Sequence, residues 1–555
     1  MTIDYHRRMS RHPIDDQADL LDIPAAAREP RGWHALKLDP ELITGKRRGR
    51  IVLVTAITPT PAGEGKTTTS VGLVDGLRRR GALAVAALRQ PSLGPVFGAK
   101  GGAVGGGKAM LTPQEGINLH FTGDIHAVTS AHALLSALLD NHVHHQSEPK
   151  LSAERITWGR ALDMNDRALR SIEVGLAKGG PRRKERTDIT AASEVMAVLC
   201  MAKDVPDLRA RLGRIVVGTL EDGSPVTAER INAAGAMAAL LLDAARPNLV
   251  KTLEGSPALV HAGPFGNVAP GTSSLIQTQL ARQIADVVVT EGGFAFDLGG
   301  FKFIDLQCRA GGFLPAAIVL VATVRALRYQ GGCAEFARPD AEAVARGLEN
   351  LTAHLEAMKR LGLPAPIVAI NRFPNDSAEE LALVKRCAEE AGATAVEASH
   401  FTDGGQGAEA LADAVLANLE RNPHDSPHYR PAYDVASPLP QKIEALAKTL
   451  LGASGIDLSP KAQADLAMLE KAGLDELPLC LAKTHLSISD DAAIRGRPAP
   501  FVLRVTGLRA AAGAGFVVVL CGPILTMPGL AARPAASNID IERDASGKWR
   551  AKGLA

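Results

Sequence analysis

The chain has 555 residues, of which 46% are hydrophobic and 22% are charged, and its formal net charge is +2 at pH 7. This length gives room for roughly two to four domains of ordinary globular composition. The near balance of charge excludes the bulk basic signature of a nucleic-acid or membrane-surface protein, and no apolar run reaches the roughly 18–20 residues that would span a bilayer.

The N-terminus lacks the apolar core of a secretory signal, so we expect a cytoplasmic protein. The cysteines contain no CxxC pair, which argues against a disulfide framework or a zinc site. We expect reduced thiols at Cys200, Cys308, Cys333, Cys387, Cys480 and Cys521.

The first element in the chain is an apolar, β-branched run over residues 51–57, followed by a Gly-rich turn and a helical pattern. That order of strand, turn and helix is the context of a phosphate-binding loop, in which Lys66 reaches the β- and γ-phosphates and the Thr67 hydroxyl binds Mg²⁺. Thr60 stands where the strict motif has glycine, so the loop is a variant. We predict that ATP is bound by Thr58, Pro59, Thr60, Pro61, Ala62, Gly63, Glu64, Gly65, Lys66, Thr67 and Thr68.

Further apolar runs alternate with helical patterns such as 227–246 and 340–360. Runs of this kind are typical of parallel strands buried on both faces, and the alternation predicts an α/β fold with a doubly wound, mostly parallel sheet. Ligands of such sheets bind beyond the carboxyl ends of the strands, where Arg89, Glu291 and Asn371 follow three of the runs. The strand candidates are 51–57, 82–88, 215–218, 258–262, 286–290, 317–323 and 366–370.

Two segments interrupt this alternation. Residues 100–200 suggest a largely helical insertion that opens with glycines, and residues 425–440 suggest a linker before a smaller α/β segment. We therefore predict a nucleotide-binding core over residues 1–345, a second α/β domain over 346–435, and a small C-terminal α/β domain over 436–555.

Several long motifs resemble those of the formate–tetrahydrofolate ligase family, over residues 50 to 542. The resemblance implies an ATP-dependent ligase with Mg²⁺, a monovalent cation (K⁺ or NH₄⁺) and a homotetrameric assembly. It implies formyl phosphate as the intermediate that the amine of tetrahydrofolate attacks. The motifs are 58–69 (TPTPAGEGKTTT), 91–95 (PSLGP), 118–126 (NLHFTGDIH), 165–169 (NDRAL), 193–197 (SEVMA), 322–327 (ATVRAL) and 526–530 (TMPGL).

Formyl phosphate formation brings one anion against another, so cations must neutralise the developing charge. Lys66 and Arg89 each follow a strand and suit that task, and Asp124 is a candidate for orienting Mg²⁺ or the monovalent cation. The alternative for Arg89 is a surface ion pair, and for Asp124 a helix cap. Gly105 and Gly106 are candidates for backbone donors to the acyl phosphate, unless this segment is only a flexible loop.

The resemblance assigns an aromatic pair to the pterin ring of folate, and the matching positions here are Phe373 and Phe401. It thereby implies that the domain over 346–435 lies on the folate side. The alternative is that each phenylalanine anchors its own loop in the core.

The chain departs from the family pattern at Lys108, Pro270, Ser273, Phe301 and Leu486. Lys108 and Phe301 would change the charge and shape of a pocket, although we keep Lys108 among the substrate-binding candidates. Two alternatives follow from these departures. One is an ATP-dependent ligase for another carboxylate or pterin carrier, and the other is a non-catalytic protein that binds nucleotide or folate.

Overall fold

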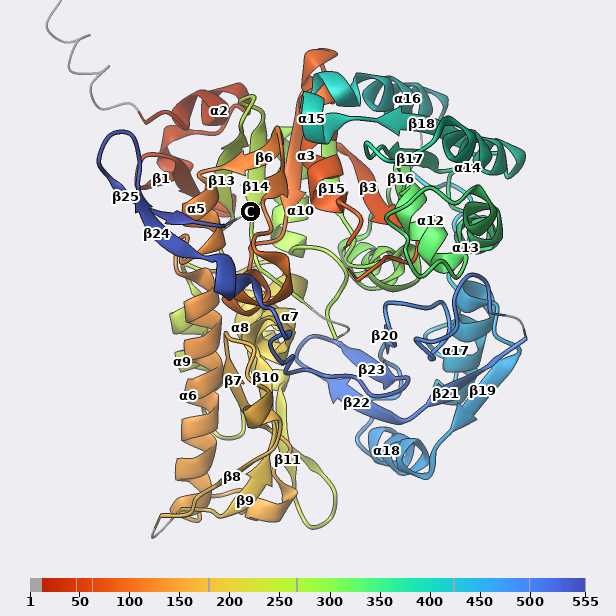
Figure 1. The fold of residues 1–555 in the computed structure, drawn as a ribbon. Helices are drawn as coiled ribbons and strands as arrows, with labels where there is room; N and C mark the ends of the chain where they lie inside the picture. Colours follow the sequence, from red (N-terminus) through yellow and green to blue (C-terminus); the bar gives the residue numbers. More distant parts are fainter. Residues whose placement is uncertain are drawn as a thin grey trace, which may run out of the picture.

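The computed structural model describes residues 12–45, 47–61, 63–177, 180–265, 268–422, 425–498 and 500–554. Its centre is a 12-stranded sheet with the order β1-β2-β13-β14-β4-β15-β3-β16-β17-β18, and β5 and β6 join it beside β13. From β14 to β18 every neighbouring pair is parallel, whereas β1, β2, β13 and β6 add antiparallel pairs at one edge (Figure 1). The predicted α/β class with a mostly parallel sheet is confirmed.

The strands of the parallel part coincide with the predicted runs to within a few residues, except that β18 was not predicted. Their apolar, β-branched sequences leave nearly every residue of β3, β4 and β16 buried on both faces. The bounds are β14 Pro257–Val260, β4 Ala84–Leu88, β15 Val287–Glu291, β3 Arg50–Ala56, β16 Ala317–Ala322, β17 Ile367–Asn371 and β18 Thr394–Ala398.

Side chains of β3 alternate between two layers of helices. Val52 and Val54 pack with α3 (Lys66–Arg79) and α16 (Glu409–Arg421). Ile51 and Leu53 belong to the core on the other face, which α10 (Leu275–Ile284) and α13 (Ala341–Arg360) cover. The sheet is therefore doubly wound, and its loops at the carboxyl ends of the strands lie between the two layers.

Two predicted elements differ from the structure. Residues 215–218 do form a strand, β11 (Val216–Thr219), but it pairs with β12 (Pro225–Thr227) in a separate two-stranded sheet. The helix expected over 227–246 is only α9 (Ala234–Leu241). The apolar alternation found these segments but did not specify their partners.

The antiparallel edge was not predicted. It consists of β1 (Arg28–Arg31), β2 (Ala35–Leu38), β13 (Asn248–Thr252), β5 (Gly105–Gly106) and β6 (Ala109–Thr112). β13 pairs with β2, β6 and β14, so strands distant in sequence meet at this edge. Short strands whose partners are so remote carry little local signal.

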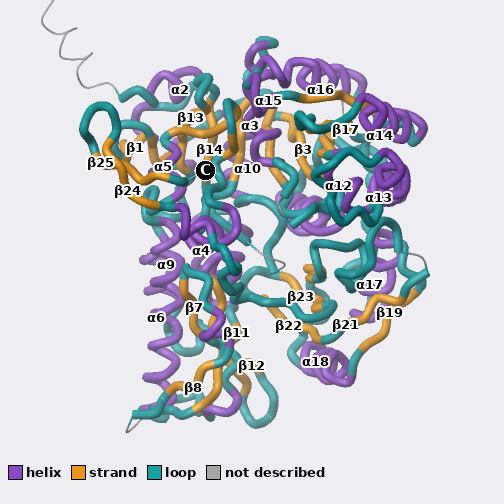
Figure 2. Tube along the Cα trace, in the orientation of Figure 1, coloured by secondary structure: helices purple, strands orange, loops and turns teal. Residues whose placement is uncertain are grey.

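The insertion over 100–200 contains the long helix α6 (Asp124–His144) and α7 (Glu194–Met201), but the residues between them form turns and short strands (Figure 2). These helices share a second core with α8 (Val205–Arg214), α9 and part of β23. The segment is therefore less helical than predicted.

The C-terminal segment begins with α17 (Leu439–Leu446) and forms two small sheets. One pairs β19 (Gly455–Leu458) with β21 (Val502–Val505), beside α18 (Pro460–Lys471). The other contains β20 (Leu479–Ala482), β22 (Gly507–Ala511) and β23 (Phe516–Leu520). The final hairpin, β24 (Asp540–Arg543) and β25 (Trp549–Lys552), returns to α5 (Gln114–Asn118), where Ala551 donates to Glu115.

The predicted boundary at residue 345 falls inside α13, and β17 and β18 continue the central sheet beyond it. The three-part division of the chain stays a prediction. Among the described residues, no helix combines the length and the apolar character needed to cross a membrane.

Candidate functional site

The predicted phosphate-binding loop connects β3 to α3 at the carboxyl edge of the sheet. Gly63 and Gly65 both have positive φ angles, of 81° and 73°, which favour glycine. Gly65 is the residue before the first turn of α3, so the N–H groups at the start of the helix point toward the loop, where they can bind an anion. Thr58 to Pro61 and Gly63 to Thr68 lie in this arrangement, while Ala62 lies outside the described residues.

Glu64 holds the loop from inside. Its buried carboxylate accepts a hydrogen bond from the Thr60 N–H at 2.6 Å and another from the Thr323 hydroxyl. Asn371, at the end of β17, donates to the Glu64 carbonyl at 3.1 Å. Burial raises the pKa of Glu64. Side chains at the ends of two neighbouring strands, β16 and β17, therefore fix the loop.

Glu291, the last residue of β15, lies at the centre of the polar site. Its carboxylate accepts a hydrogen bond from the Thr67 hydroxyl at 2.7 Å and pairs with the Arg89 guanidinium at 3.2 Å. Burial alone would raise the pKa of Glu291, but Arg89, Thr67, Lys100 and Lys66 together hold it below its ordinary value. An ionised carboxylate thus lies beside the threonine that the loop motif assigns to a metal ion.

Three cations surround this one carboxylate. The ammonium groups of Lys66 and Lys100 make no hydrogen bond to any residue that the structure describes, although both interact electrostatically with Glu291. Removal from solvent, together with the nearby Lys100 and Arg89, lowers the pKa of Lys66 to about 8, although Glu291 and Glu64 oppose this shift. Lys100 is an exposed residue, and partial desolvation of its ammonium group together with the neighbouring Arg89 lowers its pKa to about 8. The site carries excess positive charge.

Asp124 belongs to a different network. It begins α6, is almost completely buried, and accepts hydrogen bonds from Lys37 at 2.6 Å, Asn248 at 2.8 Å and Thr122 at 3.2 Å. Lys37 lies on β2 and Asn248 on β13. These contacts join the insertion helix to the antiparallel edge of the sheet, and none of them is shared with Glu291.

Phe401 and the glycine segment pack against each other. Lys108 N–H donates to the Phe401 carbonyl at 2.9 Å, and a Cβ at Gly106 would lie 3.1 Å from the Phe401 ring. A Cβ at Gly107, whose φ is 60°, would lie 2.0 Å from the Phe401 carbonyl oxygen, so this approach requires glycine. The Phe401 side chain remains 58% exposed. The structure therefore brings Gly105, Gly106, Lys108 and Phe401 together, beside Thr68 of the loop.

Phe373 follows β17, the neighbour of the strand that precedes Phe401. Its ring is 36% exposed and lies under the Arg325 guanidinium, at 4.9 Å from the ring centroid. Both predicted aromatic residues are thus at strand ends and accessible, rather than core anchors.

Comparison with known proteins shows the family of the chain. A family model described as formate–tetrahydrofolate ligase matches residues 1–554. The chain belongs to the formate–tetrahydrofolate ligase family. A relative of that name from Methylobacterium nodulans is 49% identical over 98% of both chains, and one from Myxococcus xanthus is 51% identical over 93% of this chain and 94% of its own. Another, from Acidiphilium cryptum, is 50% identical over 98% of both.

The departures from the ligase-family pattern occupy different environments. Phe301 is packed in the main hydrophobic core. Pro270 and Ser273 are also buried, and the Ser273 hydroxyl accepts a hydrogen bond from Gln277. Leu486 is half-buried and Lys108 is exposed. Of these five positions, Lys108 is the one in direct contact with a predicted substrate-binding residue.

Three residues of this ligase-family chain contact the loop, although the sequence assigned them no role: Glu291, Asn350 and Arg325. The sequence predicts Glu291 at a strand end, yet its hydrogen bond with Thr67 requires β15 to lie beside β3, an order that the sequence does not show. Asn350 accepts a hydrogen bond from the Thr58 N–H at 3.1 Å, and Arg325 donates to the loop at Gly63. For Arg325 the motif over 322–327 was a usable signal.

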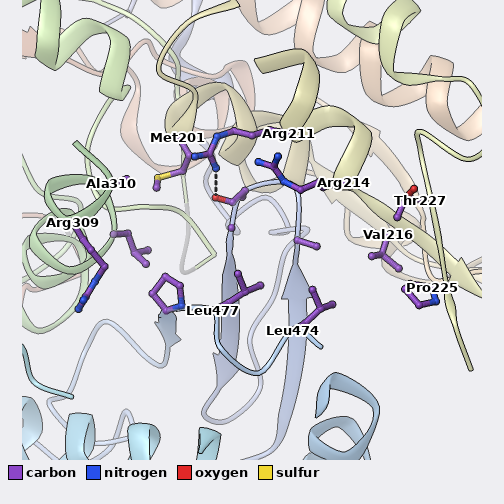
Figure 3. A pocket seen from close by; sticks show the side chains of 15 residues that line it. Met201, Arg211, Arg214, Val216, Pro225, Thr227, Arg309, Ala310, Leu474 and Leu477 are labelled. Atoms are coloured by element: carbon purple, nitrogen blue, oxygen red, sulfur yellow. Dashed lines mark hydrogen bonds between the residues drawn. The ribbon is translucent and has the colours of Figure 1, made fainter. Parts of the chain in front are cut away.

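A cavity of about 430 Å³ lies elsewhere in this ligase-family chain, between residues 201–227, residues 306–310 and the C-terminal segment (Figure 3). Its walls are mostly apolar, and Arg211 at its edge donates to the Ala514 carbonyl at 2.9 Å. None of the predicted site residues lines it. The lining residues are Met201, Arg211, Arg214, Val216, Pro225, Thr227, Leu306, Arg309, Ala310, Leu474, Leu477, Pro478, Ala512, Ala514 and Gly515.

Proposed function

We propose that this chain ligates formate to tetrahydrofolate at the expense of ATP, giving 10-formyltetrahydrofolate, ADP and phosphate through formyl phosphate. Membership of the formate–tetrahydrofolate ligase family supports this activity. The observation that carries the proposal for the site is the cluster of Lys66, Arg89 and Lys100 around Glu291, next to the loop.

In this proposal the loop N–H groups and Lys66 bind the β- and γ-phosphates of ATP. Arg89 is only partly paired with Glu291, so its guanidinium can also bind a second anion. Its planar fork suits the carboxylate of formate or the transferred phosphoryl group. The cations reduce repulsion between the two anions as they approach. Lys100, which the sequence did not single out, adds a third positive charge.

The Thr67 hydroxyl and the Glu291 carboxylate fit Mg²⁺, because both are hard oxygen ligands and Mg²⁺ takes few protein ligands beside phosphates and water. The described residues contain no cluster of three or more acidic, histidine or cysteine ligands, which agrees with a metal carried mainly by the nucleotide. When bound, Mg²⁺ supplies neutralisation of the phosphate charge. We include K⁺ or NH₄⁺ and a homotetramer in the proposal on the family resemblance alone.

On the folate side, we propose that Phe373 and Phe401 stack on the pterin ring and that Gly105, Gly106 and Lys108 border the same space. The exposed rings and the contact of Phe401 with the glycine segment support this assignment. For Asp124 the contacts support a positioning role, since Lys37, Asn248 and Thr122 occupy its oxygens.

The test is product formation by the purified chain with ATP, Mg²⁺ and K⁺, with formate and tetrahydrofolate omitted in turn. ADP and the folate product, converted by acid to its methenyl form, are measured together. We expect product only when both substrates are present. ADP release that depends on a different carboxylate, with no folate product, would instead establish the altered-substrate alternative. Glu291→Gln should raise the Mg²⁺ concentration required for half-maximal rate, whereas an unchanged requirement would remove Glu291 from the metal site.

A further inference from the structure

Arg325 connects the nucleotide loop with the aromatic residue proposed for folate. It lies in the first turn of α12 (Val324–Gln330), which follows β16. In the sheet, β16 lies between β3, which leads into the loop, and β17, which leads to Phe373. The topology therefore places Arg325 between the two halves of the proposed active site.

Its guanidinium contacts both halves. One nitrogen donates to the carbonyl oxygen of Gly63 in the loop at 2.6 Å. The guanidinium carbon lies 4.9 Å from the centroid of the Phe373 ring. The Arg325 Nε atom is buried and has no hydrogen-bond partner among the described residues. The guanidinium is therefore held by its contacts to Gly63 and Phe373. A planar cation suits this double contact, because it donates in its plane and stacks through its face.

Each contacted segment has its own anchor. The loop is tied to Thr323, the residue that caps α12, through Glu64. The Phe373 N–H donates to the Asp376 carboxylate at 2.8 Å, and Arg328 of the same helix α12 lies 3.4 Å from that carboxylate. One short helix thus holds both segments, and Arg325 contacts each of them directly.

We propose that Arg325 is a positioning residue that couples the binding of ATP to the binding of folate. This inference rests on the proposed function, because it takes the loop as the ATP site and Phe373 as part of the folate site. Phosphates that draw on the N–H groups of the loop change the position of the Gly63 carbonyl, and Arg325 transmits the change to the face of Phe373. By linkage, folate stacking tightens ATP binding by the same factor.

The experiment measures the dissociation constant of tetrahydrofolate by calorimetry, without formate, in the absence and presence of a saturating non-hydrolysable ATP analogue with Mg²⁺. The ratio of the two constants is the coupling factor. It is determined for the unaltered chain, for Arg325→Gln and for Arg325→Lys. Arg495→Gln is the matched control, since Arg495 also stacks on a ring, that of Tyr329 at 4.1 Å, and donates to a carbonyl, but makes no hydrogen bond or ion pair with a described residue of the loop.

We expect a coupling factor of about ten for the unaltered chain, within the usual range for coupled sites. Arg325→Gln should reduce this coupling factor below about two, because it removes the contact that joins the two segments. Arg325→Lys keeps the charge but not the fork and should give an intermediate factor. It also carries the test if thermal unfolding shows that Arg325→Gln does not fold.

Three results would overturn the proposal: a factor of one in the unaltered chain, an unchanged factor in the Arg325 variants, or an equal loss in Arg495→Gln. They differ from failure of the proposed function, in which the unaltered chain does not bind ATP and tetrahydrofolate at all.

Discussion

Two pairs of opposite charges at the sheet, Lys37–Asp124 and Arg89–Glu291, are built differently. In the first, the nitrogen and oxygen are 2.6 Å apart and the side chains are 0% and 2% exposed. Asp124 also accepts from Asn248 and Thr122. In the second, the atoms are 3.2 Å apart and the Arg89 side chain is 18% exposed. Lys66 and Lys100 add positive charge that no described carboxylate neutralises by contact.

The difference teaches what separates a structural ion pair from a binding site. A buried ion pair whose hydrogen-bonding groups are all occupied has none left to bind a ligand. Removing one partner of such a pair leaves the other charge unpaired in the core. A cluster with excess positive charge attracts an anion, which neutralises that charge. Asp124 and Glu291 are both acidic residues next to a glycine, but of the two only Glu291 is surrounded by several cations, Arg89, Lys66 and Lys100.

Lys66→Ala gives the largest expected effect on the incomplete cluster. The substitution removes a cation that we propose binds the transferred phosphoryl group, so kcat/KM for ATP should fall by about 10³-fold or more. Because the Lys66 ammonium makes no hydrogen bond to a described residue, the free energy of unfolding should change little. Steady-state kinetics and urea unfolding of the same preparation measure both quantities. Loss of stability comparable to the loss of activity would break the comparison.

Asp124→Asn tests the complete pair and should show the opposite pattern. Lys37 would remain buried without a counter-charge, so the free energy of unfolding should fall by about 3–5 kcal/mol. The folded fraction should retain kcat within about threefold, because Asp124 shares no contact with Glu291. Urea unfolding and active-site-normalised kinetics measure the two effects.

The matched control for Asp124 is Asp243→Asn. Asp243 pairs with Arg31 at 2.7 Å, but both side chains are partly exposed, and exposed pairs contribute about 1 kcal/mol or less. A fall of kcat by two orders of magnitude in folded Asp124→Asn would support the role in orienting Mg²⁺ or the monovalent cation for which the sequence makes Asp124 a candidate.

These pairs also show how far sequence reasoning reaches. The loop, the strand ends and the exposed rings are local features, since glycines before a Lys-Thr pair and β-branched runs carry their signal within a few residues. The partner of each charge is not local. Lys37 and Asp124, or Thr67 and Glu291, meet only because β2 and β15 take particular places in the sheet. The same limit explains why the antiparallel edge and the partner of residues 215–218 were missed.

Phe401→Ala extends the comparison to apolar groups, because the exposed ring of Phe401 has apolar surface that the protein itself does not cover. Loss of the ring should raise the KM for tetrahydrofolate about tenfold, which corresponds to about 1.4 kcal/mol of stacking. The KM for ATP should change less than twofold. Phe296→Ala, which removes a fully buried ring, is the contrasting control and should lower stability by about 3–5 kcal/mol. An unchanged KM for tetrahydrofolate would remove Phe401 from the folate site.

The smallest effect is the pH dependence of ATP binding. The pKa values of Lys66 and Lys100 are lowered from 10.5 to about 8, so both lysines are charged below pH 8 and lose their protons as the pH rises through it. ATP favours the charged forms. Its dissociation constant should therefore rise about fourfold for each lysine between pH 7 and 8.5, a change measurable by calorimetry with a non-hydrolysable analogue.

Arginine stays protonated over this range, so Lys66→Arg and Lys100→Arg should each remove one share of the rise, and the double variant should bind ATP almost independently of pH. The residual slope of the double variant also reports the last ionisation of the γ-phosphate, which free ATP shows without the protein. A fourfold rise of the dissociation constant that persists in both single variants and in the double variant would mean that the two lysines are already neutralised in the free protein. The electrostatic contrast between the Glu291 cluster and the Lys37–Asp124 pair would then be wrong.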